Sequence, residues 1–76
     1  MNKERILNII AEVLQEDVSK LNIDSNYENT SSWDSLATTN IIVAIEEELD
    51  IDIELDDAEQ FISLKNILRI IEEKYS

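Results

Sequence analysis

Apolar residues recur at intervals of three and four near the start of the chain, a spacing that predicts an amphipathic helix. Positions spaced in this way share one face of an α-helix, which a globular protein buries against its core. We therefore expect a first helix from about Asn2 to Gln15. The residues of its apolar face are Ile6, Leu7, Ile9, Ile10, Val13 and Leu14.

From Glu16 to Asp34 this periodicity stops, and Asn, Ser, Thr and Asp become frequent. Such side chains compete for backbone hydrogen bonds and disfavour a helix interior, so a long loop is predicted, with a short helical turn near residues 18–21 as an alternative within it. Loops of this length in compact domains are usually functional. We expect four isolated apolar residues to pin the loop to the core, namely Val18, Leu21, Ile23 and Tyr27.

A second helix is predicted from Leu36 to Leu49, because Asp34 and Ser35 are both residue types that cap helices and no Gly or Pro interrupts the run. Its predicted apolar side contains Leu36, Ile41, Ile42, Ile45 and Leu49. The next residues, up to Leu55, alternate between apolar and acidic, which alone is typical of a β-strand. No second run of period two exists to pair with it, so we predict an extended connector. Some of Ile51, Ile53 and Leu55 should be buried.

The last third of the chain predicts two more helices. Asp56 or Asp57 can cap a short one that ends near Phe61 or Ile62, and Ser63 can cap the final one. Three longer helices, one short helix and one long loop indicate an all-α fold, a small four-helix bundle that forms a single domain over residues 1–76. The apolar positions of the final helix are Leu64, Ile67, Leu68, Ile71 and Tyr75.

Composition removes most catalytic chemistry. The 76 residues include no His, Cys, Gly or Pro, so the chain offers no imidazole base, thiol nucleophile or Gly-rich phosphate loop, and an enzyme is not expected. Asp50, Asp52, Glu54 and Asp56 have the spacing of calcium-loop ligands. The Gly and the bidentate Glu of such a loop are replaced by Leu55 and Phe61, so no specific metal site is expected.

The charge is strongly acidic and concentrated in the middle of the chain. Eighteen acids against six bases give a net charge of −12, and the segment from Leu21 to Leu64 holds twelve acids and no Lys or Arg. This charge disfavours nucleic acids and anionic membranes as partners and favours basic proteins. The charged segment after Met1 does not have the pattern of a signal peptide, and no apolar run is long enough to span a bilayer. We therefore expect a soluble, cytoplasmic protein.

Ser35 places a hydroxyl where the long loop meets the second helix. A phosphate ester at this position would lie near free backbone N–H groups and the positive end of the helix dipole. Without an adjacent base, Ser35 suits a phosphorylated attachment point better than a nucleophile. A simple capping role for Ser35 or Asp34 is the alternative.

Combined with the length, acidity and helix order, the Asp-Ser-Leu run at residues 34–36 resembles the acyl carrier protein family. Residues 44–49 and 57–59, and the spacing of Tyr27 ahead of Ser35, agree with the same family. The resemblance implies a stand-alone carrier that is not an enzyme, with a 4'-phosphopantetheine arm joined to Ser35 by a phosphodiester and acyl groups held on the arm as thioesters. It also implies that a carrier-protein synthase (phosphopantetheinyl transferase) installs the arm and is engaged by Asp34.

A docking surface is expected on the second helix, where Leu36, Asn40, Val43 and Glu47 share a face displaced from the core stripe. Leu36 and Val43 are either exposed contacts within an acidic rim that includes Glu46, or ordinary core residues. The surrounding charge would steer basic patches of acyl-loading and acyl-transfer enzymes toward Ser35. Trp33 either closes the loop onto the bundle or contacts the arm or a partner.

Two departures from the family pattern are present: missing acids on the second helix, which point to a specialised role, and a different run before Asp34, which predicts a different loop geometry. Ala37 and Asn40 stand where fatty-acid carriers usually have acids, and residues 31–33 replace a run of Leu, Gly and a small residue. We expect a monomeric carrier that serves a dedicated pathway, such as polyketide or other secondary metabolism, in place of general fatty acid biosynthesis. The alternatives are an aminoacyl or peptidyl carrier, and an acidic interaction module or nucleic-acid mimic without a prosthetic group. Sequestration of the cargo by the core is left open.

Overall fold

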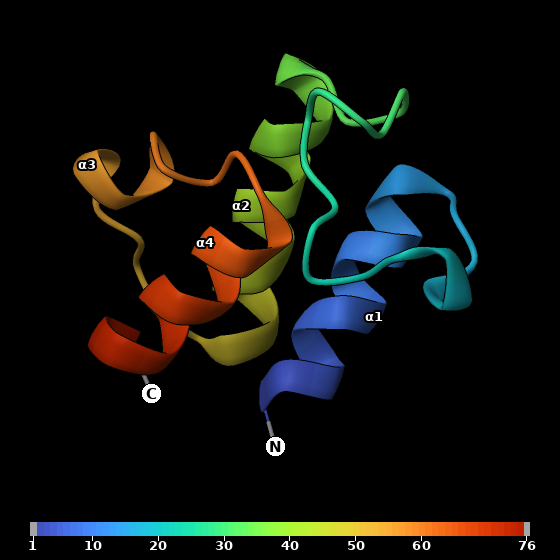
Figure 1. Ribbon diagram of the computed structural model, residues 1–76. Helices are drawn as coiled ribbons and strands as arrows, with labels where there is room; N and C mark the ends of the chain where they lie inside the picture. Colours follow the sequence, from blue (N-terminus) through green and yellow to red (C-terminus); the bar gives the residue numbers. More distant parts are fainter. Residues whose placement is uncertain (1, 76) are drawn as a thin grey trace.

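The computed structural model describes residues 2–75 and consists of four α-helices, one 3-10 turn and one π-helical segment (Figure 1). No strand is present in these residues, so the all-α four-helix prediction is confirmed. No helix in the same part of the chain combines the length and the apolar character needed to cross a bilayer. The helices are α1 (Asn2–Leu14), α2 (Ser35–Leu49), α3 (Leu55–Ala58) and α4 (Leu64–Ile70). A 3-10 turn at Val18–Lys20 and a π-helical segment at Ile71–Tyr75 complete the fold.

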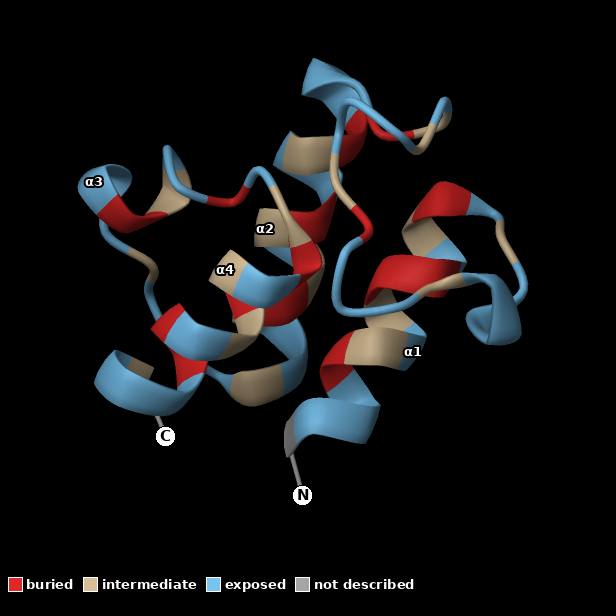
Figure 2. Cartoon of the chain, viewed as in Figure 1, coloured by how far each residue is buried: buried red, intermediate tan, exposed pale blue. Residues whose placement is uncertain are grey.

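The core lies between α1, α2, α4 and the long loop that joins α1 to α2 (Figure 2). The first two helices run antiparallel and side by side, so the start of α2 lies at the same end of the bundle as the end of α1 (Figure 1). Their predicted apolar stripes supply much of the buried surface, together with the stripe of α4. The largest fully buried side chains are Trp33, Phe61, Ile6, Ile10, Ile41, Ile45, Leu64, Ile67 and Ile71.

Helix ends are marked by local backbone chemistry without any glycine. The first helix stops at Leu14 because Gln15 takes a positive φ of 56°, and α2 stops at Leu49 because Asp50 takes a φ of 54°. A left-handed residue just after a helix allows backbone N–H groups to reach its last carbonyls. At the start of α4, the Ser63 hydroxyl oxygen accepts the Asn66 backbone N–H at 3.1 Å, as predicted.

The long loop is held differently from the prediction. Of the four expected pins, Leu21 is partly buried, but Val18, Ile23 and Tyr27 are 43–52% exposed, so that prediction was wrong for these three. The loop is attached through its backbone instead. The Tyr27 N–H donates to the Ile62 carbonyl at 3.2 Å, and the Leu64 N–H donates to the Ser25 carbonyl at 2.9 Å. These bonds fix the loop to the turn before α4. Because they join backbone groups, they do not require apolar side chains at regular spacing in the loop.

The segment from residue 51 to residue 54 is the predicted extended connector, with Ile51 and Ile53 partly buried against the core. The short helix that follows does not begin with the predicted cap. Its first residue is Leu55, which is 74% exposed, and the preceding Glu54 makes no side-chain cap. The predicted cap residue Asp57 lies inside α3 and is buried, because distant partners hold it there.

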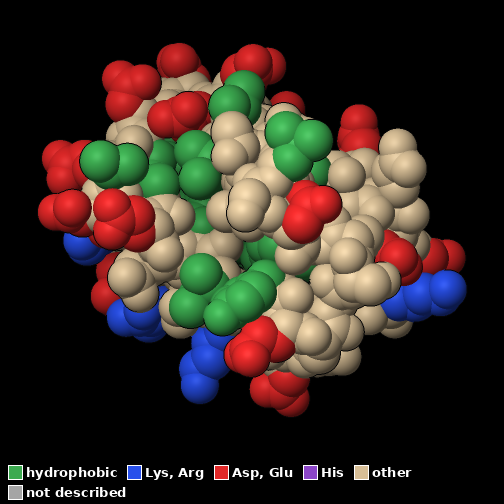
Figure 3. Space-filling view, turned by 90° about the horizontal axis from the view of Figure 1, so that it is seen from above, with side chains coloured by type: hydrophobic (Ala, Val, Ile, Leu, Met, Phe, Trp, Pro, Cys, Tyr) green, Lys and Arg blue, Asp and Glu red, His purple; other side chains and the backbone are tan. Residues whose placement is uncertain are grey.

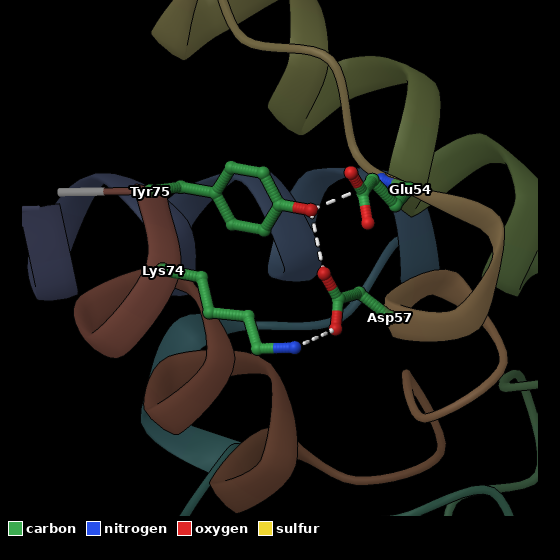
Figure 4. A network of polar contacts seen from close by, with 4 residues as sticks. All are labelled: Glu54, Asp57, Lys74 and Tyr75. Carbon is green, nitrogen blue, oxygen red and sulfur yellow. Dashed lines mark hydrogen bonds and ion pairs between the residues drawn. The ribbon is translucent and has the colours of Figure 1, made fainter.

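Asp57 joins α3 to the end of the chain through a polar network (Figure 4). The Lys74 ammonium donates to Asp57 Oδ1 at 2.7 Å, and the Tyr75 hydroxyl donates to Asp57 Oδ2 at 2.6 Å. The Glu54 backbone N–H donates to the same Tyr75 oxygen at 3.0 Å. The hydrogen bonds from Lys74 and then Tyr75 stabilise the carboxylate and lower the pKa of Asp57. This network fixes both ends of α3 to the final helical segment.

Candidate functional site

Ser35 is the first residue of α2 and is exposed at the end of the bundle where the long loop arrives. The backbone there is already helical, because the Thr38 N–H donates to the Asp34 carbonyl at 2.9 Å, and the Ser35 carbonyl also accepts the Thr39 hydroxyl at 3.1 Å. The side-chain hydroxyl is therefore presented to solvent on a fixed helix terminus. This geometry gives a separate modifying enzyme access to the serine oxygen without unfolding of α2.

Asp34 is the residue that caps α2. Its Oδ1 accepts the Ala37 backbone N–H at 2.8 Å, and its carbonyl accepts the Thr38 N–H at 2.9 Å. The sequence left both Asp34 and Ser35 as cap candidates, and the structure gives that role to Asp34. The hydroxyl of Ser35 is thus not needed to begin the helix.

Trp33 lies in the core and is only 2% exposed. Its indole N–H donates to Thr38 Oγ1 at 3.0 Å, and that hydroxyl in turn donates to the Asp34 carbonyl at 3.0 Å. The chain of bonds couples the end of the loop to the first turn of α2. Trp33 is therefore the residue that closes the loop onto the bundle, and its alternative assignment as a docking contact was wrong because the ring is enclosed.

The first turn of α2 fits a phosphodiester on Ser35. The first backbone N–H groups of an α-helix have no partner within the helix, and the helix dipole places partial positive charge at this end. In α2 the Asp34 carboxylate takes the N–H of Ala37, so the N–H groups of Ser35 and Leu36 remain at the tip. An exposed hydroxyl next to these groups can carry an anionic ester with a favourable local field.

The predicted docking face of α2 is exposed. Leu36 is 70% exposed and Val43 is 46% exposed, while Asn40 and Glu47 are exposed on the same helix. The alternative that Leu36 and Val43 are core residues is therefore wrong. Seen from the end of the bundle where α2 begins, apolar side chains interrupt a surface rich in Asp and Glu (Figure 3). An apolar contact area with acidic surroundings is thus available beside Ser35.

Glu46 differs from the other predicted docking residues. It is only partly exposed, and its Oε2 accepts the Ile53 backbone N–H at 2.9 Å. The carboxylate therefore holds the connector between α2 and α3 against the end of α2. Its charge lies on the flank of the docking face, with one oxygen already engaged.

Two exposed apolar residues near α3 were not among the predicted site residues. Leu55 at the start of α3 is 74% exposed, and Ile62 in the turn before α4 is 43% exposed. The alternating run grouped Leu55 with Ile51 and Ile53 on one side of an extended segment. The chain turns into α3 at Leu55, and this change of direction takes its side chain away from the core. The exposure of Leu55 could have been predicted only by knowing that α3 begins at this residue.

The acidic residues do not assemble into a metal centre in the described part of the chain, where no group of three or more potential ligands converges. Asp50, Asp52, Glu54 and Asp56 are all exposed on the connector and the start of α3. Their contribution is a field of negative charge on the side of the bundle that includes α3.

Comparison with known proteins agrees with this geometry. The family model for the phosphopantetheine attachment site matches residues 4–71. The chain is also similar to an acyl carrier protein of Picosynechococcus sp., with 39% identity over 77 residues that cover 97% of this chain and 95% of the relative. The family match includes most of α1 and the whole of α2, α3 and α4.

Proposed function

The chain belongs to the acyl carrier protein family, whose cofactor is covalently attached 4'-phosphopantetheine, and we propose that Ser35 is the residue that bears the arm. The arm supplies a thiol that the 76 residues lack, on which acyl groups are held as thioesters. Ser35 then acts as an attachment point and not as a catalyst. The chemistry at the thiol belongs to partner enzymes.

The observation that carries this proposal is the exposed hydroxyl on the first residue of α2. The cap is supplied by Asp34, so a bulky ester on Ser35 leaves the hydrogen bond that begins the helix intact. The Trp33–Thr38–Asp34 bonds keep the loop in place while the serine oxygen stays accessible. The helix dipole favours the negative charge of the phosphodiester.

Partner enzymes approach, in this proposal, along α2. The face made by Leu36, Asn40, Val43 and Glu47 offers apolar contacts close to Ser35, and Glu46 adds charge at its flank. A carrier-protein synthase would install the arm, engaged by Asp34, and acyl-loading and acyl-transfer enzymes would follow on the same face. Charged groups at the rim of an interface accelerate encounters more than they tighten complexes, which suits a carrier that must leave each enzyme.

We further propose that the chain serves a specialised pathway with an acyl cargo. Asn40 places a neutral amide on the exposed docking face, and Ala37 is 8% exposed and contributes no charge there. Enzymes of general fatty acid biosynthesis that depend on acids at these two positions would then bind weakly. Complementation of a strain that lacks its housekeeping carrier tests this point, because growth with the ordinary synthase enzymes would contradict it.

Intact-mass measurement tests the attachment itself. The purified chain is incubated with coenzyme A, Mg²⁺ and a broad-specificity carrier-protein synthase, and one phosphopantetheine mass should be added. Ser35→Ala should gain no mass, while the control Ser31→Ala, an exposed serine in the same loop, should be modified like the wild type. Modification of Ser35→Ala would contradict the proposal.

A further inference from the structure

A groove runs between α1 and α2, separate from the exposed tip that holds Ser35. Its volume is about 490 Å³, within the range of about 300–1,000 Å³ that is common for binding pockets. Arg5, which precedes Ile9 by one turn of α1, bridges the two helices. Its Nη2 donates to the Glu48 carbonyl oxygen at 2.8 Å. The lining residues are Ile9, Glu12, Val13, Ala44, Glu47 and Glu48.

The floor of the groove is apolar. Ile9 and Val13 lie one turn apart on α1, pack against the core cluster on one side, and remain partly exposed on the other. Across from them, the small side chain of Ala44 leaves space between the helices. A row of apolar positions flanked by two helix ridges accepts side chains spaced by three and four residues on a third helix.

The rim of the groove is acidic on both helices. Glu12 on α1 and Glu47 on α2 are exposed, and no Lys or Arg of the described residues pairs with either. Glu48 is shared with Arg5, whose Nη2 lies 3.2 Å from its Oε1. An occupant with cations on both sides of an apolar row would complement this arrangement.

We propose that this groove is a second docking site, which binds a basic amphipathic helix of a partner protein. A second copy of this chain is disfavoured, because each copy has a net charge of −12. An uncharged acyl chain could use the floor but would gain nothing from Glu12 and Glu47. A helix with an apolar stripe flanked by Lys or Arg uses both features.

The site goes beyond the proposed carrier function and does not require modification of Ser35. Ala44 and Glu48 lie on the flank of α2 that faces α1, whereas Leu36 and Val43 belong to the exposed face beside Ser35. Glu47 is the one residue shared by the two surfaces. A partner in the groove can therefore hold the carrier while the tip of α2 remains accessible to other enzymes.

Titration of the isotope-labelled 76-residue chain with a synthetic helix, followed by NMR of the backbone amides, locates the site. The probe has about 18 residues, long enough for a stable helix, with leucines along one face and lysines elsewhere. We expect the largest shift changes at residues 9–13 and 44–48. A control of the same composition, with its leucines spread around the helix, should bind at least about five-fold more weakly. Changes confined to residues 35–43, or equal binding of the control, would overturn the proposal.

Two matched charge reversals test the rim. Glu12→Lys and Glu73→Lys change the net charge equally, and both residues are exposed. Glu12→Lys should weaken probe binding about five- to ten-fold, while Glu73→Lys, on the π-helical segment, should weaken it less than about two-fold. Equal weakening of probe binding by the two variants would show that the probe is attracted by overall charge, and would overturn the proposal of a docking site in the groove.

A further pair of variants separates this inference from the proposed function. Ala44→Gln, which fills the groove with a longer polar side chain on a helix, should weaken probe binding by at least about five-fold with α-helical circular dichroism unchanged. Ser35→Ala should bind the probe like the wild type. Unaltered binding by Ala44→Gln would contradict the groove, while failure to load Ser35 would contradict only the carrier proposal.

Discussion

Replacement of Trp33 tests how the loop is held beside Ser35. The ring is 2% exposed and donates a hydrogen bond of 3.0 Å to Thr38, which connects to the Asp34 carbonyl. Trp33→Phe removes this bond and part of the buried ring, which costs about 1–2 kcal/mol. Trp33→Ala removes the whole ring and costs about 3–5 kcal/mol.

These losses are large for a chain of this size. A domain of 76 residues has a free energy of unfolding of about 4–11 kcal/mol. For a domain of this length, each 1 kcal/mol shifts Tm by about 4–8 °C, so Trp33→Phe should lower Tm by about 4–16 °C. Trp33→Ala should unfold a substantial fraction of the protein near physiological temperature.

Thermal unfolding followed by circular dichroism measures the effect, and Tyr27→Ala is the matched control. Tyr27 is an aromatic residue of the same loop but is 52% exposed, so its replacement should change the free energy of unfolding by less than about 0.5 kcal/mol. Tryptophan emission should also stay unchanged when Ser35 is modified. Equal Tm shifts for Trp33→Phe and Tyr27→Ala, or quenching of Trp33 by the arm, would refute this account of the loop.

Three further predictions concern the cap, the docking face and the buried carboxylate. Asp34→Ala loses the α2 cap and should lower Tm by about 4–8 °C. Asp34→Asn keeps a capping oxygen and should leave Tm unchanged, but the carrier-protein synthase should modify it more slowly. An undiminished rate would exclude Asp34 as a contact of the synthase. Leu36→Ala, at a 70% exposed position, should change stability by less than about 0.5 kcal/mol while slowing acyl loading. Hydrogen bonds from Lys74 and Tyr75 lower the pKa of Asp57 below its ordinary value of 3.8. The stability that the ionised Asp57 gives to the fold is therefore present above that pH and is lost as the pH falls through the folded-state pKa. Asp57→Asn has no carboxylate to protonate at this position, so its free energy of unfolding should fall less on acidification than that of the exposed control Asp56→Asn, which keeps Asp57. Denaturant unfolding at several pH values measures both.

The parts of the fold that were predicted from the sequence depend on local patterns. Apolar residues at helical spacing identify α1, α2 and α4 because each helix buries one continuous stripe. Ser63 was identified as a cap because its hydroxyl acts on a backbone N–H only three residues away. The extended connector was recognised because the alternating run around Ile51 and Ile53 has no second strand to pair with.

The parts that were not predicted depend on contacts between distant residues. Asp57 looked like a cap, but its partners Lys74 and Tyr75 lie 17 and 18 residues further along the chain. Tyr27 looked like a pin, but a backbone bond to Ile62 fixes the loop and leaves the ring exposed.

At the candidate site, the sequence indicated the position but not the division of roles. Asp34 and Ser35 have equal claims to the cap by residue type, and only the bond to Ala37 assigns it to Asp34. The helical period placed Leu36 and Val43 on one face without showing whether a neighbouring segment covers that face. In the described part of the folded chain no segment covers that face, and Leu36 and Val43 are 70% and 46% exposed.

Fragment-ion mass spectrometry of the modified chain tests the central claim most directly. The account predicts that the full mass of one phosphopantetheine is located on Ser35, with none on the neighbouring Ser31, Ser32, Thr38 or Thr39. Location of the arm on any of those hydroxyls, or a chain that acquires no arm from coenzyme A and an active synthase, would contradict it.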